Sequence, residues 1–172
     1  KYVGYVLKSA RLHRVKPALV MAIIETESAF NPMARSRSNA LGLMQVKANT
    51  AGQDYFSQIK GYSHTPSSAY LYQPVQNIEI GSGYLSILAG RYLAGINDPI
   101  KLEDAMIASY NGGAGNLWRS LNSSGDRKRA IDRINKMTTR EFYWFLTNRH
   151  IRSETRDYVR KVRTKMSKYQ DL

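Results

Sequence analysis

Hydrophobic residues recur every three or four positions along most of this chain, which is the pattern of helices with one buried face. Expected helices cover residues 2–13, 17–30, 48–58, 74–93, 99–110, 114–121, 126–136, 138–149 and a last segment from about residue 153. Loops are expected over residues 35–39 and 61–73. Gly81, Gly83 and Gly90 inside one expected helix predict close packing of a neighbouring helix. No segment alternates with the period of a strand, so the sequence predicts an all-α globule.

The second expected helix carries an acidic residue at its end. Pro17 opens this helix, and at about 100° per residue one of its faces collects Leu19, Val20, Ile23 and Ile24. Glu27 falls on the same face. Burial there would raise the pKa of its carboxyl, as a general acid near neutral pH requires. Glu25 lies about 200° around the helix and is interpreted as a structural residue.

A glutamate at a helix end is more often solvated or ion-paired than catalytic, so this position alone decides nothing. The segment that follows is more informative. Between Ser28 and Ala51 the chain has no Asp or Glu, and it offers neutral side chains, namely Ser36, Ser38, Asn39, Met44 and Gln45. Glycoside cleavage usually needs two carboxylates. A sugar site at Glu27 would therefore use a mechanism with one carboxylate.

Length and composition limit the other possibilities. The 172 residues suit one domain, and 42% hydrophobic residues can form a core. No apolar stretch reaches the roughly 18 residues that span a bilayer. Cysteine is absent, which excludes disulfides and thiolate metal sites. His13, His64 and His150 are scattered without the spacing of a metal site, so no metal is expected.

The chain is strongly basic and begins at Lys1. Its net charge of +13 predicts an anionic partner, which could be a nucleic acid, a membrane surface or an acidic polymer. Because the first residue is not methionine, we expect a processed or truncated chain that has lost an upstream anchor or domain.

Four blocks of sequence resemble, in order, the motifs of the soluble-lytic-transglycosylase-type domain. They are Glu27-Ser28-Ala29-Phe30-Asn31-Pro32, Ala40-Leu41-Gly42-Leu43-Met44-Gln45-Val46, Ala108-Ser109-Tyr110-Asn111-Gly112-Gly113 and Glu154-Thr155-Arg156-Asp157-Tyr158-Val159. The resemblance runs from about residue 15 to 165. Segments 37–42 and 92–96 are most similar to membrane-bound lytic murein transglycosylases of types C and E.

This resemblance implies a lysozyme-like, goose-type all-α fold with a central cleft, with residues 1–172 forming one catalytic domain. It implies a lyase that cleaves the β-1,4 bond between N-acetylmuramic acid (MurNAc) and N-acetylglucosamine (GlcNAc) in peptidoglycan and leaves 1,6-anhydro-MurNAc ends. Glu27 would be the acid and then the base, and Tyr158 would hydrogen-bond the catalytic carboxyl. The implied substrate-binding residues are Ser36, Ser38, Met44, Gln45, Tyr110 and Asn111.

The resemblance also implies a setting for the protein. It implies a monomer in the periplasm or cell envelope, held at the outer membrane by a lipid on a missing N-terminal segment. The partner would be peptidoglycan glycan strands rather than nucleic acid, and no cofactor or metal would be needed.

Other interpretations of the same residues stay open. A goose-type lysozyme would hydrolyse the same bond with water. A basic helical module could bind nucleic acid through residues 156–168, and a wall-binding module need not be catalytic. Tyr158 and Met44 could be ordinary core residues. Asn111 could simply prepare the Gly112-Gly113 turn, and Ser36 and Ser38 could lie in a solvated loop.

Overall fold

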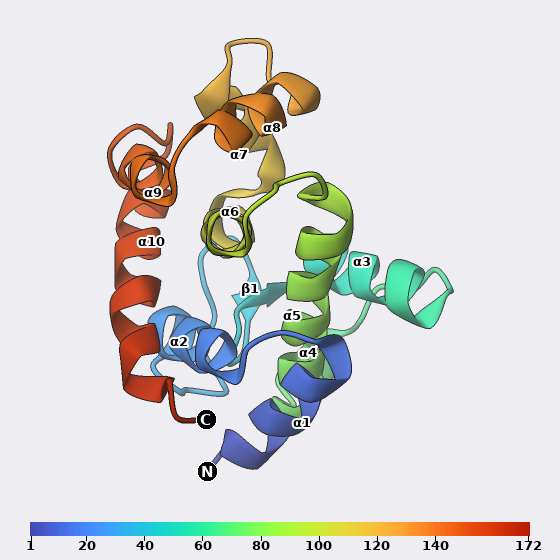
Figure 1. Ribbon diagram of the computed structural model, residues 1–172. Helices are drawn as coiled ribbons and strands as arrows, with labels where there is room; N and C mark the ends of the chain where they lie inside the picture. Colours follow the sequence, from blue (N-terminus) through green and yellow to red (C-terminus); the bar gives the residue numbers. More distant parts are fainter. The chain divides into compact units, whose positions relative to one another are not determined.

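The structure is a computed structural model that describes all residues, 1–172, and it is mainly helical (Figure 1). Its contacts group the chain into two compact units. Unit 1 contains residues 1–87 and 163–172, and unit 2 contains residues 88–162. Each unit is described by itself. No helix in either unit is both long and apolar enough to cross a membrane.

Unit 1 consists of helices around a very short hairpin. Its elements are α1 (Val3–His13), α2 (Pro17–Ser28), β1 (Ala40–Leu41), β2 (Val46–Lys47), η1 (Ala48–Gly52), α3 (Gln53–Tyr55), η2 (Phe56–Lys60), α4 (Ser68–Leu71), α5 (Pro74–Ile87) and η4 (Ser167–Tyr169). The two strands are antiparallel, and Leu41 pairs with Val46. Helix α1 packs against both α2 and α5. The hairpin and the single turn of α4 were not expected from the hydrophobic pattern, because each is too short to show a period.

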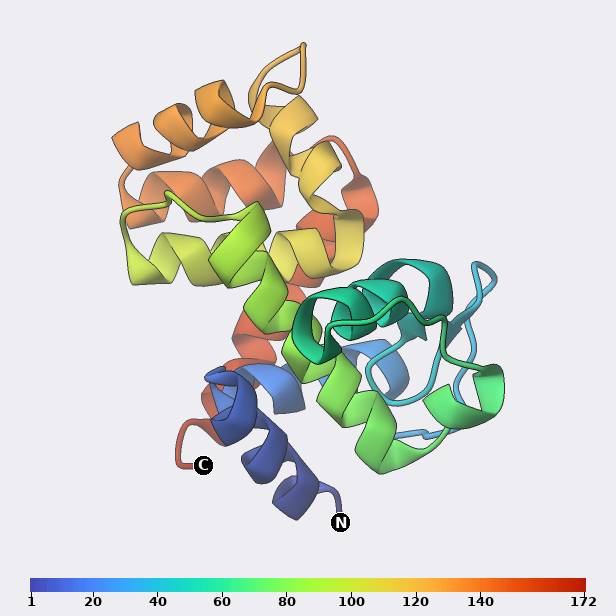
Figure 2. The ribbon, with the colours of Figure 1, turned by 90° about the vertical axis from the view of Figure 1, so that its right-hand side faces the viewer.

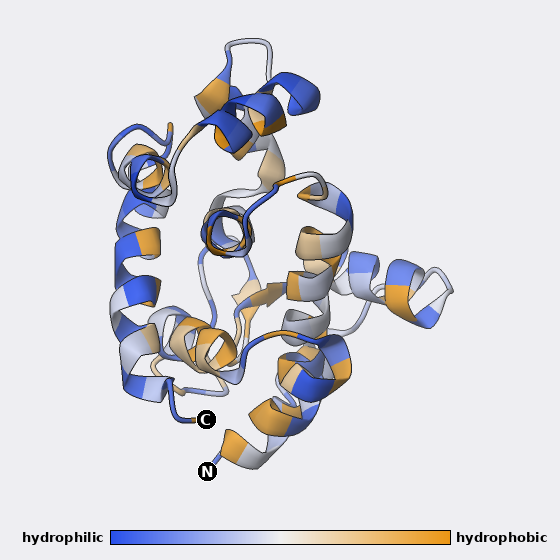
Figure 3. Cartoon of the chain, in the orientation of Figure 1, coloured by the Kyte–Doolittle hydropathy of each residue, from blue (hydrophilic) through white to orange (hydrophobic).

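The core of unit 1 includes α2, whose middle is buried on every side. Six consecutive residues, 19–24, are at most 5% exposed, so the single apolar face expected from periodicity is not what the structure shows. An apolar segment that is hydrophobic all round is typical of a helix within the core. Figure 3 shows the contrast with α8 (Arg127–Lys136), which is largely hydrophilic. The helix stops because Ala29 (φ 49°) and Phe30 (φ 64°) take left-handed conformations.

In unit 2, one buried helix is surrounded by the other helices. Its elements are η3 (Leu88–Tyr92), α6 (Pro99–Gly112), α7 (Ala114–Leu121), α8, α9 (Thr139–Asn148) and α10 (Ser153–Met166), of which the last four residues count with unit 1. Helix α6 contacts η3, α7 and α9, and residues 103–109 of it are all buried. Lys101 Nζ donates to Ile134 O (2.9 Å) and Met137 O (2.7 Å), which ties the start of α6 to the end of α8.

The glycines in and beside α5 test the close packing that was expected from the sequence. A Cβ on Gly83 would lie 2.6 Å from the ring of Tyr55 in α3, and one on Gly81 would lie 2.4 Å from Met44 Sδ. Both residues must therefore be glycine for the neighbouring side chain to approach, although Met44 belongs to a turn rather than a helix. The expectation is wrong for Gly90, where a Cβ would meet nothing within 4 Å.

Candidate active site

Glu27 lies in the last turn of α2 and is partly exposed. The next residue fixes this helix end to the loop that follows. Ser28 Oγ lies 2.8 Å from Leu43 O and 3.0 Å from Ile24 O, so the hydroxyl joins α2 to the turn between β1 and β2. We call residues 42–45 the Gly42–Gln45 turn. The two sequence motifs that carry the resemblance in unit 1 are therefore in direct contact.

Asn77 on α5 holds the Gly42–Gln45 turn in place. Its side chain has no exposed surface. Oδ1 accepts from Met44 N at 2.7 Å, and Nδ2 donates to Leu41 O and Leu71 O, both at 2.8 Å. Gly42 has φ +77°, and a Cβ there would lie 2.4 Å from Asn77 Nδ2. Sequence reasoning missed Asn77, although a lone asparagine among apolar residues of a buried helix could have identified it.

Met44 is fully buried and packs against the backbone of α5 at Gly81. This geometry supports the core role left open above, and the contact of Met44 with a sugar stays a prediction. Gln45 has a left-handed backbone (φ 50°), and its Nε2 donates to Ala34 O (3.1 Å) and Gly42 O (3.0 Å). Because these two bonds use both amide hydrogens, any bond from Gln45 to a sugar must be accepted by Oε1.

The loop before β1 is closed by Ser36. Ser36 Oγ accepts from Ala40 N at 3.0 Å and lies 3.2 Å from Ser38 Oγ. Ser36 N also donates to Ala40 O at 3.0 Å. Ser36 therefore shapes the loop, while Ser38 is exposed at its tip. Of the two serines, Ser38 is the one with a hydroxyl displayed to solvent, and its contact with substrate stays a prediction.

Glu25 lies on the opposite side of α2 from Glu27 and is anchored to the C-terminal segment. Lys168 Nζ lies 2.8 Å from Glu25 Oε2, and Tyr169 Oη donates to Oε1. These two hydrogen bonds lower the pKa of the Glu25 carboxyl. Burial and the bond to Glu25 raise the pKa of Tyr169 to about 12. The structural interpretation of Glu25 is confirmed.

In unit 2, Tyr110 and Asn111 lie at the C-terminal end of α6, as expected. The amide of Asn111 is engaged at both ends by the start of α10. Its Nδ2 donates to Glu154 Oε2 (2.8 Å), and its Oδ1 accepts from Thr155 Oγ1 (2.7 Å). A Cβ on Gly112 would lie 2.6 Å from Thr155 Oγ1, so glycine permits this approach. The motif asparagine thus joins two helices, and its contact with a sugar stays a prediction.

Tyr158 lies on the buried face of α10, together with Val159 and Val162. Its exposed fraction is 5%. The four-residue spacing of Tyr158, Val162 and Met166 predicts one inner face of this helix, and the burial of all three residues confirms it. The expected hydrogen bond from Tyr158 to Glu27 would join residues of different units and stays a prediction.

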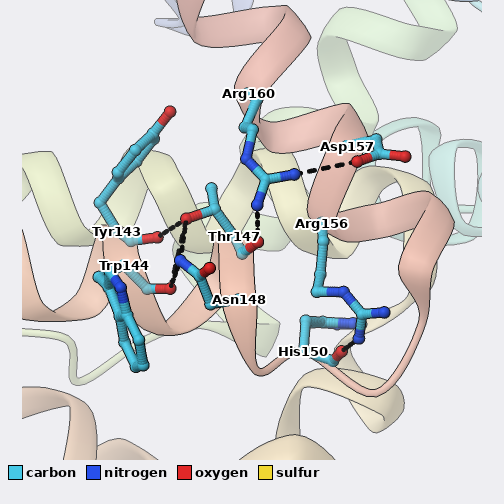
Figure 4. Close-up of polar contacts among 8 residues, drawn as sticks. All are labelled: Tyr143, Trp144, Thr147, Asn148, His150, Arg156, Asp157 and Arg160. Atoms are coloured by element: carbon cyan, nitrogen blue, oxygen red, sulfur yellow. Dashed lines mark hydrogen bonds and ion pairs between the residues drawn. The ribbon is translucent and has the colours of Figure 1, made fainter.

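The corner between α9 and α10 orients the helix that carries Tyr158 (Figure 4). Arg156 Nη1 donates to His150 O (2.5 Å), and Arg160 donates to Thr147 O at the end of α9. Cations at a helix C-terminus satisfy carbonyls that lack partners within the helix. Arg160 Nη1 also lies 3.0 Å from Asp157 Oδ1. These contacts occupy two of the arginines on which the nucleic-acid alternative depended.

His150 lies in this corner and has no exposed surface. Burial, followed by the charge of Arg152, lowers the pKa of His150 to about 4. Its Nδ1 accepts from Arg152 N at 3.1 Å, so the neutral ring carries its proton on Nε2. The structure thus places His150 in the core of unit 2. No group of three His, Cys, Asp or Glu side chains is placed to hold a metal ion.

Comparison with known proteins gives concordant findings. A family model described as the transglycosylase SLT domain matches residues 4–132. The chain is 46% identical over 169 residues to membrane-bound lytic murein transglycosylase C of Pectobacterium atrosepticum. The match covers 98% of this chain and 46% of that relative, so the chain spans about half the length of the relative.

Two solved structures resemble this chain over 98% of its length. In each case the match covers 24% of the solved chain. One is an inactive mutant of lytic transglycosylase Slt from Pseudomonas aeruginosa, with a TM-score of 0.68 and 25% identity. The other is the 70 kDa soluble lytic transglycosylase Slt70 from Escherichia coli, with a TM-score of 0.72 and 24% identity.

Proposed function

The chain belongs to the transglycosylase SLT domain family, and from this premise we propose that it is a peptidoglycan lytic transglycosylase. The all-α, lysozyme-like fold expected from the sequence is confirmed. The observation that carries the proposal is local to unit 1. Glu27 lies at a helix end that Ser28 joins to the Gly42–Gln45 turn, and no Asp or Glu lies between Ser28 and Ala51.

In the proposed reaction, Glu27 first acts as general acid. It gives its proton to the glycosidic oxygen while the bond between that oxygen and the anomeric carbon of MurNAc breaks. The acetamido oxygen of the same sugar stabilises the oxocarbenium-like centre in place of a second carboxylate. Glu27, now a carboxylate, takes the proton of the MurNAc 6-hydroxyl. That oxygen bonds to the anomeric carbon, so a 1,6-anhydro ring forms and no water is consumed.

The remaining predicted residues have proposed supporting roles. Tyr158 would hydrogen-bond the Glu27 carboxyl, and Gln45 would accept from a sugar N–H or O–H through Oε1. Ser38, Tyr110 and Asn111 would contact the sugar, while Ser36 and Met44 would act mainly by shaping the loop and the turn. We propose that both units belong to one catalytic domain.

The cellular location is proposed from the name of one relative. The relative from Pectobacterium is named a membrane-bound enzyme. We place this protein in the cell envelope and propose a periplasmic position at the outer membrane, held by a lipid on an upstream segment. Glycan strands of peptidoglycan are its proposed partner, and we expect a monomer that binds no nucleic acid.

Mass spectrometry of the products from purified peptidoglycan tests the proposed function. Muropeptides ending in 1,6-anhydro-MurNAc, each one water lighter than the hydrolysis product, are expected. Products that end mainly in reducing MurNAc would instead assign the chain to hydrolysis by a goose-type lysozyme. No release of soluble fragments would contradict both enzyme functions.

A further inference from the structure

A cluster of aromatic side chains lies in unit 1 outside all the residues assigned to cleavage. Phe56 is its centre, with ring centroids 5.7 Å from Tyr62, 4.7 Å from His64 and 6.0 Å from Tyr70. Phe56 is 4% exposed, but Tyr62 is 55% exposed and Tyr70 is 37% exposed. We call these four residues the aromatic patch. Exposed rings gathered in this way are more often a binding surface than single exposed residues are.

The chain displays these rings on an ordered loop. Gly61 takes φ +87°, and the N–H groups of Gly61 and Tyr62 both donate to Phe56 O. Gln53 Nε2 donates to Thr65 Oγ1 at 2.7 Å, and Ser67 caps α4 by accepting from Tyr70 N. In Figure 1 this segment, coloured teal, lies to the right of α5, and in Figure 2, which views the chain from that side, it lies toward the viewer.

Polar groups lie beside the rings. Tyr55 Oη donates to Glu79 Oε2, and Lys60 Nζ lies 3.7 Å from the same oxygen. Burial and the charge of Glu79 raise the pKa of Tyr70, so its phenol stays protonated at neutral pH. The surface therefore combines flat apolar rings with hydroxyls, one carboxylate and one ammonium, and the two charges are opposite in sign.

This combination suits a sugar chain better than the other polymers of the cell envelope. A pyranose in its chair form has an apolar face of axial C–H groups that can lie on an aromatic ring, while its equatorial groups hydrogen-bond at the rim. A phosphate backbone or an anionic lipid surface would require unpaired positive charges, whereas Lys60 is paired with Glu79.

We propose that the aromatic patch is a second glycan-binding site, which binds the N-acetylated sugar rings of a peptidoglycan strand away from the bond that is cleaved. This inference rests on the proposed function for its substrate class. The site would increase affinity for long strands and leave the turnover of short ones unchanged, because a short oligosaccharide bound at Glu27 does not also need the patch.

The test uses the Glu27→Gln protein and peptide-free chitohexaose in an NMR titration of backbone amide signals. Signals of Tyr62, His64 and Tyr70 should shift and saturate. Tyr62→Ala should weaken this binding about fivefold to tenfold, where tenfold corresponds to about 1.4 kcal/mol. Tyr62→Phe should keep most of the affinity, because it keeps the ring. Tyr5→Ala is the matched control, since Tyr5 is a 46% exposed tyrosine of the same unit outside the patch.

The outcomes separate this proposal from the proposed function. Shifts confined to the Gly42–Gln45 turn would overturn the patch proposal and leave the proposed function intact. Shifts at the patch that require stem peptides, and are absent with chitohexaose, would also overturn it. If the wild type releases no anhydro products but the patch still binds chitohexaose, the patch proposal stands and the proposed function fails. Tyr62 is largely exposed, so circular dichroism should show that its variants fold normally.

Discussion

The end of α2 in unit 1 and the end of α6 in unit 2 carry the two groups of candidate residues, and they are held by different chemistry. Around Glu27, neutral groups fix the backbone: Ser28 and Asn77 bond to main-chain atoms, and neither brings a charge. Around Asn111, two charged groups, Arg152 and Glu154, join the neutral hydroxyl of Thr155. The backbone at the end of α2 is thus fixed by uncharged groups, whereas ionic groups help to hold the helix corner at the start of α10.

Glu27→Gln should produce the largest effect, because it tests whether a single carboxylate at the end of α2 performs both proton transfers. The amide is nearly the same size but cannot donate or accept the catalytic proton. Turnover should fall by about a thousandfold or more, which is the upper range for general acid–base catalysis. Release of soluble anhydro-muropeptides measures it. Glu25→Gln, two residues earlier and paired with Lys168, should cost far less. Near-normal turnover by Glu27→Gln would contradict the mechanism.

Asn77→Ala should have the largest effect on stability. It removes three buried hydrogen bonds and leaves Met44 N, Leu41 O and Leu71 O without their partner. Unsatisfied buried groups cost about 1–3 kcal/mol each, with partial relaxation, so the free energy of unfolding should fall by about 3 kcal/mol. Urea unfolding measures the change. Asn148→Ala, at an exposed asparagine of α9, should change stability by under about 1 kcal/mol.

Much of the fold could be predicted from the sequence because long amphipathic segments dominate it. The helix expected at residues 114–121 has the bounds of α7, and Pro99 and Pro17 open α6 and α2 as expected. The missed pieces, β1, β2 and α4, have two to four residues each, which is too short to show a period. Periodicity also misjudged α2, since a helix buried on all sides has no face to detect.

The candidate site was only partly predictable, because its contacts join residues that are distant in sequence. Motif resemblance identified Glu27, Gln45 and Asn111, but it could not show which atoms of these side chains are already engaged. Gln45 uses both amide hydrogens within its own turn, and Asn111 uses both ends of its amide on α10. Asn77 lies more than 30 positions from the turn it supports, so no local pattern connects the two.

His150 sharpens the comparison through pH, because it is a buried titratable group at the helix corner of unit 2. Its pKa of about 4 in the folded protein is below the ordinary value of 6.5, so the unfolded chain binds the proton more readily. Stability from a neutral His150 is thus complete above pH 6.5 and is lost as pH falls toward 4. Between pH 7 and pH 5 the loss should be about 2 kcal/mol.

The measurement is the free energy of unfolding against pH for wild type and His150→Gln. The variant should show a flatter slope between pH 4 and 6.5. The pKa of His13 is also lowered by burial, but that residue is present in both proteins and its contribution cancels in the difference. Parallel pH curves for the two proteins would show that His150 is not the group responsible.

Tyr158→Phe should have the smallest effect of these changes, and it tests whether the two regions act together. The substitution keeps the buried ring on α10 and removes only the hydroxyl, so stability should change little. If that hydroxyl bonds the Glu27 carboxyl during the reaction, kcat should fall about tenfold, which is about 1.4 kcal/mol of the barrier. Tyr143→Phe on α9 is the matched control and should keep full activity.

Because a hydrogen bond to one form of a carboxyl favours that form, the pH optimum of Tyr158→Phe should also move, which loss of packing alone would not cause. Full activity with an unchanged pH profile would make Tyr158 a core residue of unit 2 and would show that Glu27 does not need its hydroxyl.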